Sequence, residues 1–194
     1  MRKLAFFVIL FGIAFLATGT SFADVAKPKS LEAIELRTGF GWGDLRKQDD
    51  YNLYPLKLAL DFNLKPLTKK FNFNPSSLLQ FQIEPFAAFI SSPSSDAEIG
   101  TSFFLKAGIL PQTSKFQPYI KVGVGLDYMT LHTSEQSTQF NFISTGAVGM
   151  HYFFKQNIAL TLEGSYRHLS NAGIDHPNTG INATIVDAGI LYQF

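Results

Sequence analysis

The sequence predicts an all-β protein, an eight-stranded antiparallel transmembrane β-barrel preceded by a cleaved signal peptide. Three observations support this fold class. From residue 31 onward, apolar and polar residues alternate in segments of roughly a dozen residues separated by turns. The chain is rich in aromatic residues, with 20 Phe, those of the predicted signal peptide included, and 7 Tyr, and about half of them fall on the apolar positions of these segments. After residue 23, no apolar run reaches the roughly 17–25 residues of a membrane helix, so any membrane crossing would use strands.

Residues 1–23 are expected to form a secretory signal peptide. Arg2 and Lys3 precede an apolar run that extends from Leu4 to about Ala17, and the small residues Ser21 and Ala23 stand where a signal peptidase cleaves. A membrane helix is the alternative, but the run is short for one and a cleavage site follows it. The remaining chain, 24–194, is then a single outer-membrane β-barrel domain.

The first half of the chain contains four segments whose side chains alternate between an apolar and a polar face, as they do along a strand. We expect strands near 31–43, 52–65, 78–90 and 99–110. Their apolar faces carry Ile34, Leu36, Phe40, Trp42, Tyr54, Leu56, Leu58, Leu60, Phe62, Leu64, Leu79, Phe81, Ile83, Phe89, Phe103, Leu105 and Ile109. Their polar faces carry Glu35, Arg37, Lys57, Asp61, Gln80, Gln82, Glu84, Ser102 and Lys106.

The second half continues the pattern, with strands expected near 117–131, 138–152, 158–170 and 182–194. Their apolar faces carry Ile120, Val122, Val124, Leu126, Tyr128, Phe140, Phe142, Val148, Met150, Tyr152, Leu160, Leu162, Val186, Ile190 and Tyr192. Turn-forming residues such as Gly, Pro, Asn and Ser separate the segments. The connection at 66–77 is longer than a turn requires, and the sequence offers no reason for its length.

A soluble barrel such as a lipocalin would show the same alternation. The distribution of charged residues and of large aromatic residues decides between a soluble and a membrane barrel. Charges of both signs lie on the polar faces and are almost absent from the apolar faces. The interior of an eight-stranded barrel is only just wide enough for side chains, and it cannot hold large aromatic residues from every strand. The aromatic residues therefore fit the outside, against lipid, while the charges pair inside.

Composition excludes several classes of function. Without the signal peptide, the chain has 14 basic and 15 acidic residues, which is not the basic surface of a nucleic-acid-binding protein. The chain has no cysteine, so disulfides, thiolate metal sites and cysteine nucleophiles are excluded. His132, His151 and His176 do not have the spacing of metal ligands. We therefore expect neither a metal nor an organic cofactor.

The last residues of the chain indicate that the barrel lies in an outer membrane. Tyr192-Gln193-Phe194 resembles the C-terminal signature of bacterial outer-membrane barrels, a closing strand that ends in aromatic-x-Phe. An even number of strands would place both termini on the periplasmic side. The connection between the last two strands, with the outer end of strand 158–170, would then lie on the extracellular side.

A histidine and a serine share the apolar face of the strand near 158–170. His168 and Ser170 are two residues apart, so they point to the same side with Cα atoms about 6.5–7 Å apart. A serine hydroxyl becomes a useful nucleophile when a neighbouring base accepts its proton. A base and a hydroxyl on a lipid-facing surface predict a lipid substrate. Taken alone, a histidine at a strand end is more often an interfacial polar residue.

The residues around this pair carry a resemblance. His168-x-Ser170-Asn171-Ala-Gly173, then Pro177-Asn178 and Gly180-Ile-Asn182, followed by a closing strand, resembles the lipid A 3-O-deacylase (PagL-type, acyloxyacyl hydrolase) family of outer-membrane barrels. The resemblance implies that His168 is the base and Ser170 the nucleophile. It further implies that Asn171, Gly173 and Asn178 surround the oxyanion and that Phe142 or Phe140 lines an acyl groove.

The third member of the catalytic group departs from the family pattern. Well-known members carry a glutamate on the last strand, whereas the matching position here is Asn182. An amide oxygen can accept a hydrogen bond from the imidazole and fix its tautomer, although it stabilises the imidazolium less than a carboxylate does. Asp187 is the nearest acid on that strand, but its parity points inward. Asp175 lies in the preceding loop and is the alternative partner.

The resemblance implies a carboxylic ester hydrolase that removes the ester-linked 3-hydroxyacyl chain from the lipid A of lipopolysaccharide. The expected partners are lipopolysaccharide and outer-membrane lipids, with no nucleic acid. The first alternative is a non-catalytic barrel, an adhesin or structural protein, in which Ser170 would be dispensable. The second is another lipid-acting enzyme, a phospholipase or acyltransferase. The sequence leaves open the acyl-chain specificity and whether the chain is a monomer or a homodimer.

Overall fold

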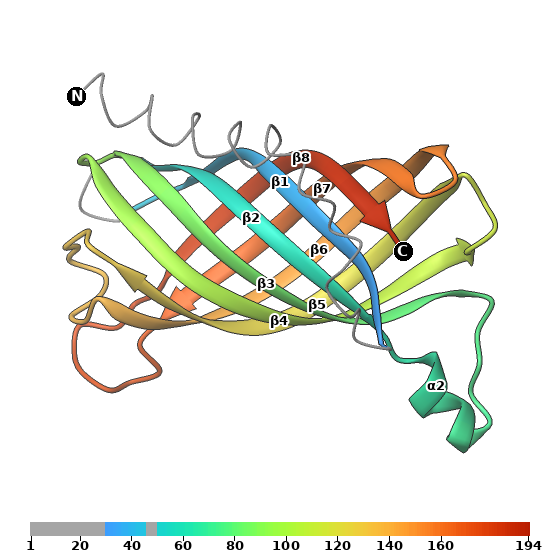
Figure 1. The fold of residues 1–194 in the computed structure, drawn as a ribbon. Helices are drawn as coiled ribbons and strands as arrows, with labels where there is room; N and C mark the ends of the chain where they lie inside the picture. Colours follow the sequence, from blue (N-terminus) through green and yellow to red (C-terminus); the bar gives the residue numbers. More distant parts are fainter. Residues whose placement is uncertain (1–29, 46–49) are drawn as a thin grey trace, which may run out of the picture.

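Eight antiparallel strands form a closed barrel in which each strand pairs with its neighbours along the chain and the last pairs with the first (Figure 1). The structure is a computed structural model that describes residues 30–45 and 50–194; the predicted signal peptide, 1–23, lies outside the described residues. The strands are β1 (Leu31–Gly43), β2 (Tyr51–Asn63), β3 (Ser77–Ser92), β4 (Asp96–Pro111), β5 (Phe116–Met129), β6 (Phe140–Lys155), β7 (Ile158–Ser170) and β8 (Ile181–Gln193). The predicted barrel is confirmed, and the strand ends lie within about three residues of the predicted ones.

The long connection between β2 and β3 contains two short helices, α2 (Lys65–Thr68) and η2 (Lys69–Phe71). Pro66 stands in the first turn of α2, where its missing N–H is not needed. Asn72 ends η2 in the left-handed conformation, with φ of 60°. Within the described part of the chain, no helix is long and apolar enough to cross a membrane.

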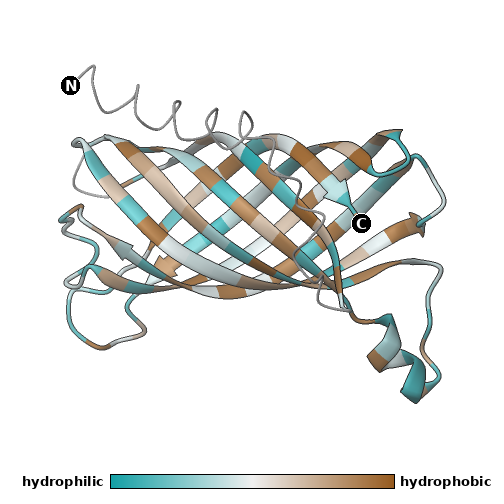
Figure 2. Ribbon diagram, viewed as in Figure 1, coloured by the Kyte–Doolittle hydropathy of each residue, from teal (hydrophilic) through white to brown (hydrophobic). Residues whose placement is uncertain are grey.

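Hydrophilic and hydrophobic residues alternate along the strands (Figure 2), and the charged side chains are buried inside while the apolar ones are exposed outside, as the alternation predicts. Leu105 and Val124 are 59% and 63% exposed on the outer surface. Lys106, next to Leu105, is fully buried inside the barrel, as is Asp61. A large apolar surface of this kind is stable when lipid covers it. The backbone N–H and C=O groups of the lipid-facing strands are hydrogen-bonded within the sheet, because a closed barrel has no unpaired edge.

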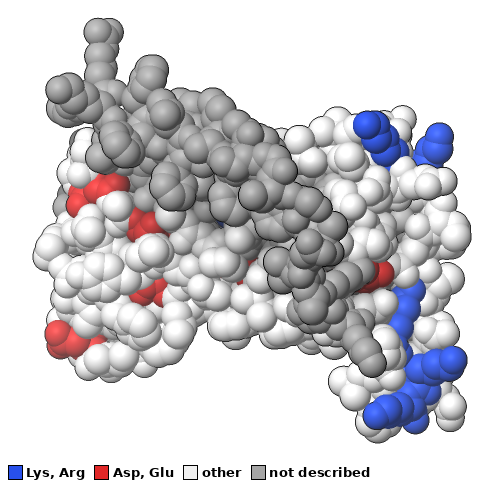
Figure 3. All heavy atoms as spheres, viewed as in Figure 1, with Lys and Arg blue, Asp and Glu red and all other residues white. Residues whose placement is uncertain are grey.

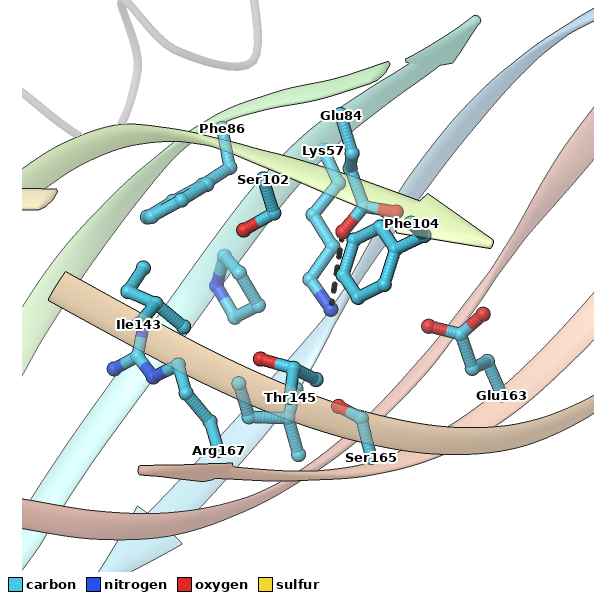
Figure 4. A pocket seen from close by; sticks show the side chains of 12 residues that line it. Lys57, Glu84, Phe86, Ser102, Phe104, Ile143, Thr145, Glu163, Ser165 and Arg167 are labelled. Carbon is cyan, nitrogen blue, oxygen red and sulfur yellow. Dashed lines mark ion pairs between the residues drawn. The ribbon is translucent and has the colours of Figure 1, made fainter. Parts of the chain in front are cut away.

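Many of the buried charges form a network around Arg37 in the middle of the barrel, and a second ion pair joins Arg167 to Glu98. The Arg37 guanidinium contacts Glu84 and Glu163 and lies 3.4 Å from Asp187 and 3.7 Å from Glu35. Lys121 bridges the same pair of glutamates, at 2.8 Å from Glu84 and 3.0 Å from Glu163. Figure 4 shows Lys57, Glu84 and Glu163 among the side chains that several strands send into the interior. Because each charge around Arg37 has an opposite partner, the network offsets part of the cost of desolvation.

Apolar side chains close both ends of this interior. One cluster lies at the end of the barrel away from the termini and includes Tyr51, Ile90, Met129 and Leu169, all nearly inaccessible. A smaller one, around Phe153, lies at the opposite end. An interior cavity lined by Lys57, Glu84, Phe104 and Arg167, among others, has about 20 Å³ of free space, enough for about one water. A lipid substrate therefore does not fit in this cavity, and a site that binds a lipid would lie on the outer surface.

Candidate active site

His168 and Ser170 lie at the end of β7 and point to the outside of the barrel. His168 is exposed and Ser170 is half-buried, whereas the intervening Leu169 and the following Asn171 are buried inside. In the register of the sheet, His168 stands opposite Asn182 on β8, and Ser170 stands opposite Phe142 on β6. The alternation along β7 thus brings the predicted base and nucleophile to one face.

A hydrogen bond joins His168 to Asn182. The imidazole Nδ1 lies 2.8 Å from the amide Oδ1 of Asn182. Because an amide oxygen can only accept a hydrogen bond, Nδ1 carries the proton and donates a hydrogen bond to Asn182. The other ring nitrogen, Nε2, is then unprotonated and can accept a proton from a hydroxyl. This is the tautomer that a catalytic base requires.

Neither acidic alternative to Asn182 reaches the imidazole. Asp187 is buried inside the barrel, where it lies 2.7 Å from the Lys57 Nζ. The Asp175 side chain is exposed in the β7–β8 loop and accepts a hydrogen bond from the backbone N–H of His176 at 2.8 Å. Of the three candidate partners, the structure brings Asn182 alone into contact with His168.

Gly180, in the same loop, packs directly against the imidazole. Its φ is +78°, a conformation that glycine adopts readily and other residues seldom do. A Cβ placed there would lie 2.4 Å from the His168 Cε1 and 3.1 Å from its Nε2. The absence of a side chain at Gly180 therefore leaves the space that the imidazole occupies.

We expect Gly180→Ala to lower activity about 10- to 100-fold, because the added methyl displaces the imidazole and a misplacement of about 1 Å can cost this much. The measurement is ester hydrolysis by the folded barrel, with circular dichroism to verify folding. Gly164→Ala is the control, because a Cβ there meets no atom within 4 Å on the outer face of β7. Equal activities of the two variants would contradict the expected role of Gly180.

The side chain of Asn171 organises the β7–β8 loop. It is fully buried, and its Nδ2 donates to the Ser137 Oγ at 3.1 Å and to the Asp175 carbonyl at 2.9 Å. Its Oδ1 accepts from the backbone N–H of Gly173 at 2.9 Å. The sequence suggested Asn171 and Gly173 as oxyanion donors, but in this conformation both of these donor groups are used within the loop.

Asn178 is the predicted oxyanion residue that lies beside the nucleophile. Its Oδ1 accepts from the backbone N–H of Asn171 at 3.0 Å, so the amide group sits next to the peptide that joins Ser170 and Asn171. A β-bridge to Gln136 and a hydrogen bond from the Ser137 N–H to the Pro177 carbonyl tie the loop to the β5–β6 connection. The amide group of Asn178 is thus held next to the Ser170–Asn171 peptide.

Aromatic rings flank the site on the outer surface. Phe142, directly opposite Ser170, is 37% exposed and makes an edge contact with Phe140, with ring centroids 5.6 Å apart. Tyr166, the next outward residue of β7, is 57% exposed. Ser170, the predicted nucleophile, therefore has apolar side chains on one side and the polar β7–β8 loop on the other.

The sequence assigned no role to Gly180, which appears there only as part of the motif, and did not point to Ser137. The contact of Gly180 with His168 and the contact between Ser137 and Asn171 depend on how the loops pack, for which the sequence has no local signal. The sequence reasoning also did not consider Ser144, a second outward serine that stands opposite His168. A register shift between Phe153 and Lys155 separates this pairing from the turn between β6 and β7, so the turn alone does not predict it.

Comparisons with known proteins agree with the geometry. The sequence model of a family described as lipid A 3-O-deacylase (PagL) matches residues 34–190, most of the chain. No curated protein matches the sequence. The outer-membrane enzyme PagL is similar in structure, with a TM-score of 0.61 and 14% identity, covering 81% of this chain and 97% of that chain. Neisserial surface protein A has a TM-score of 0.63 and 12% identity, covering 84% and 96%. At these identities the two structures establish the fold alone.

Proposed function

The chain belongs to the lipid A 3-O-deacylase (PagL) family of outer-membrane barrels, and from this membership we propose that it hydrolyses the ester of the 3-hydroxyacyl chain of lipid A by a Ser-His mechanism. The observation that carries the mechanism is the 2.8 Å hydrogen bond between His168 and Asn182, beside Ser170 on the outer surface. Because the apolar exterior of the barrel faces lipid, this site meets an acyl chain without extracting it from the membrane.

The reaction proceeds through an acyl-enzyme. His168 Nε2 accepts the proton of Ser170 as the hydroxyl oxygen attacks the ester carbonyl carbon. When the tetrahedral intermediate collapses, the imidazolium returns the proton to the departing 3-oxygen of the glucosamine. A water then attacks the acyl-serine with His168 again as the base, and the imidazolium returns this proton to the Ser170 oxygen as the 3-hydroxy fatty acid leaves. Ser170 is the last residue of β7, so water at the membrane surface can reach it.

Asn178 supports the developing negative charge in this proposal. Its amide group lies beside the Ser170–Asn171 peptide, where Nδ2 can donate to the oxyanion. Asn171 and Gly173 contribute by holding the loop in which Asn178 sits. Phe142, opposite Ser170, offers an apolar surface to the first carbons of the acyl chain. Lipopolysaccharide is thus the proposed partner, and no metal or cofactor enters any step.

The experiment that tests the proposal is mass spectrometry of lipid A from an outer membrane in which the chain is expressed. We expect loss of one 3-hydroxyacyl group and release of the matching fatty acid. Intact lipid A together with cleaved glycerophospholipid would instead indicate a phospholipase. Unchanged lipids around a folded barrel would favour a non-catalytic protein.

We expect Asn182→Ala to lower the rate about 10- to 100-fold, the value of a hydrogen bond to a group that becomes charged. Asn182→Asp should raise the rate about tenfold, because a charge-assisted hydrogen bond to the imidazolium is roughly twice as strong as a neutral one. The measurement is fatty-acid release from lipid A by the purified barrels. Thr184→Ala, the next outward position on β8, is the control. A rate for Asn182→Ala equal to that of the wild type would remove Asn182 from the mechanism.

A further inference from the structure

The β2–β3 arm, defined here as residues 65–73, combines positive charge with exposed aromatic rings. It contains Lys65, Lys69 and Lys70 and no acidic residue. None of the residues of its two helices is buried. Phe71 is 78% exposed, and Leu67 and Phe73 are 54% and 55% exposed. Exposure of apolar side chains to water in an ordered segment costs free energy unless another surface covers them.

The arm extends sideways from the barrel wall. In Figure 1 it leaves the end of the barrel that carries the C-terminus and lies beyond the outer surface of the strands, not along the barrel axis. Figure 3 shows basic side chains gathered over this arm. A bilayer around the barrel would therefore have the arm over its surface, next to the headgroups.

The charge of the arm is not compensated by the rest of the described chain. Lys69 and Lys70 are exposed and form no ion pair with any described residue. The Lys65 Nζ donates to the Gln112 side chain. The nearby carboxylate of Glu32 accepts from Gln80 at 2.8 Å and Gln112 at 2.9 Å, and not from the lysines. A partner for the arm should thus carry negative charge next to an apolar layer.

We propose that the β2–β3 arm docks on the anionic phospholipid surface of the leaflet at the terminus-bearing end of the barrel. Lys69 and Lys70 bind lipid phosphates, while Phe71 and Phe73 enter the boundary between headgroups and acyl chains. Lysines near an anionic surface and aromatic rings at the interface are the two features that hold a segment on a membrane. This role is independent of ester hydrolysis, because it uses the opposite end of the barrel from Ser170.

A fluorescent reporter at Phe71 tests the proposal in the folded, full barrel. The chain has a single tryptophan, so Trp42→Phe with Phe71→Trp places one reporter on the arm. The barrel is reconstituted in phosphatidylcholine vesicles with or without phosphatidylglycerol, and quenching by headgroup-proximal spin-labelled lipid is measured. We expect strong quenching and a blue-shifted emission with phosphatidylglycerol, both reduced by high salt.

Variants that remove charge test which lysines bind the lipid phosphates. Lys69→Gln with Lys70→Gln should weaken docking about fivefold for each lysine removed, and only in vesicles with phosphatidylglycerol. The control is Lys115→Gln with Lys155→Gln, which removes two exposed lysines from the same end of the barrel outside the arm. A reporter that stays water-exposed in every vesicle, or equal losses in the two double variants, would overturn the proposal.

Discussion

Ser170→Ala is expected to lower the rate of 3-O-deacylation by at least about 10³-fold, because the acyl-enzyme cannot form without the hydroxyl. The residual rate would come from binding and from the oxyanion donor, which the substitution leaves in place. The free energy of unfolding should change little, since Ser170 ends its strand half-buried and lies outside the interior network. Activity and stability are therefore expected to separate in this variant.

The measurement is release of 3-hydroxy fatty acid from lipid A by purified, refolded barrels, with circular dichroism to establish folding. Ser144→Ala is the matched control, because Ser144 is also an outward serine beside His168. Its neighbour on the other side is Val124, and the amide of Asn178 lies instead beside Ser170. If Ser144→Ala abolished the reaction and Ser170→Ala did not, the nucleophile would be on β6.

Arg37→Met is expected to reduce the free energy of unfolding by about 3–5 kcal/mol, because removing one partner of a buried ion pair leaves uncompensated charges. Arg37 lies among four carboxylates, those of Glu35, Glu84, Glu163 and Asp187. Lys57 and Lys121 would be left to balance them. Arg37→Lys should recover part of the loss, since it keeps the charge but cannot contact several carboxylates at once.

Denaturant titration of the barrel in vesicles measures this effect, with the emission of Trp42 as the probe of the membrane-inserted state. Lys155→Met removes an exposed charge and is expected to change the midpoint little. Folded Arg37→Met should retain ester hydrolysis, because the site lies on the other side of the barrel wall. A midpoint equal to that of the wild type would mean that the carboxylates find other partners or become neutral.

Much of the fold could be predicted because strand alternation is a local property. Apolar residues at every second position assign each side chain to one face without knowledge of its neighbours. The same parity placed His168, Ser170 and Asn182 on the outer surface. Strand geometry alone also places His168 and Ser170 two positions apart on one face, so their proposed roles as base and nucleophile could be inferred from the sequence.

Contacts across loops could not be predicted in the same way. The hydrogen bond between His168 and Asn182 depends on a register set by the β7–β8 loop, whose form rests on Asn171 and on the β5–β6 connection. Asn182 and Asp175 were therefore both open as partners of His168. One of the hydrogen bonds that hold the Asn171 side chain in place is likewise made to Ser137, 34 positions earlier in the chain.

By itself, the sequence determined that this chain is a barrel with an apolar exterior and a charged interior, and that His168 and Ser170 share its outer face, since these follow from a period of two. Tertiary structure alone decided which carboxylates surround Arg37, which residue orients His168 and where the β2–β3 arm lies. Each of these depends on residues that are distant in sequence, and closure of the barrel, with the packing of its loops, brings them together.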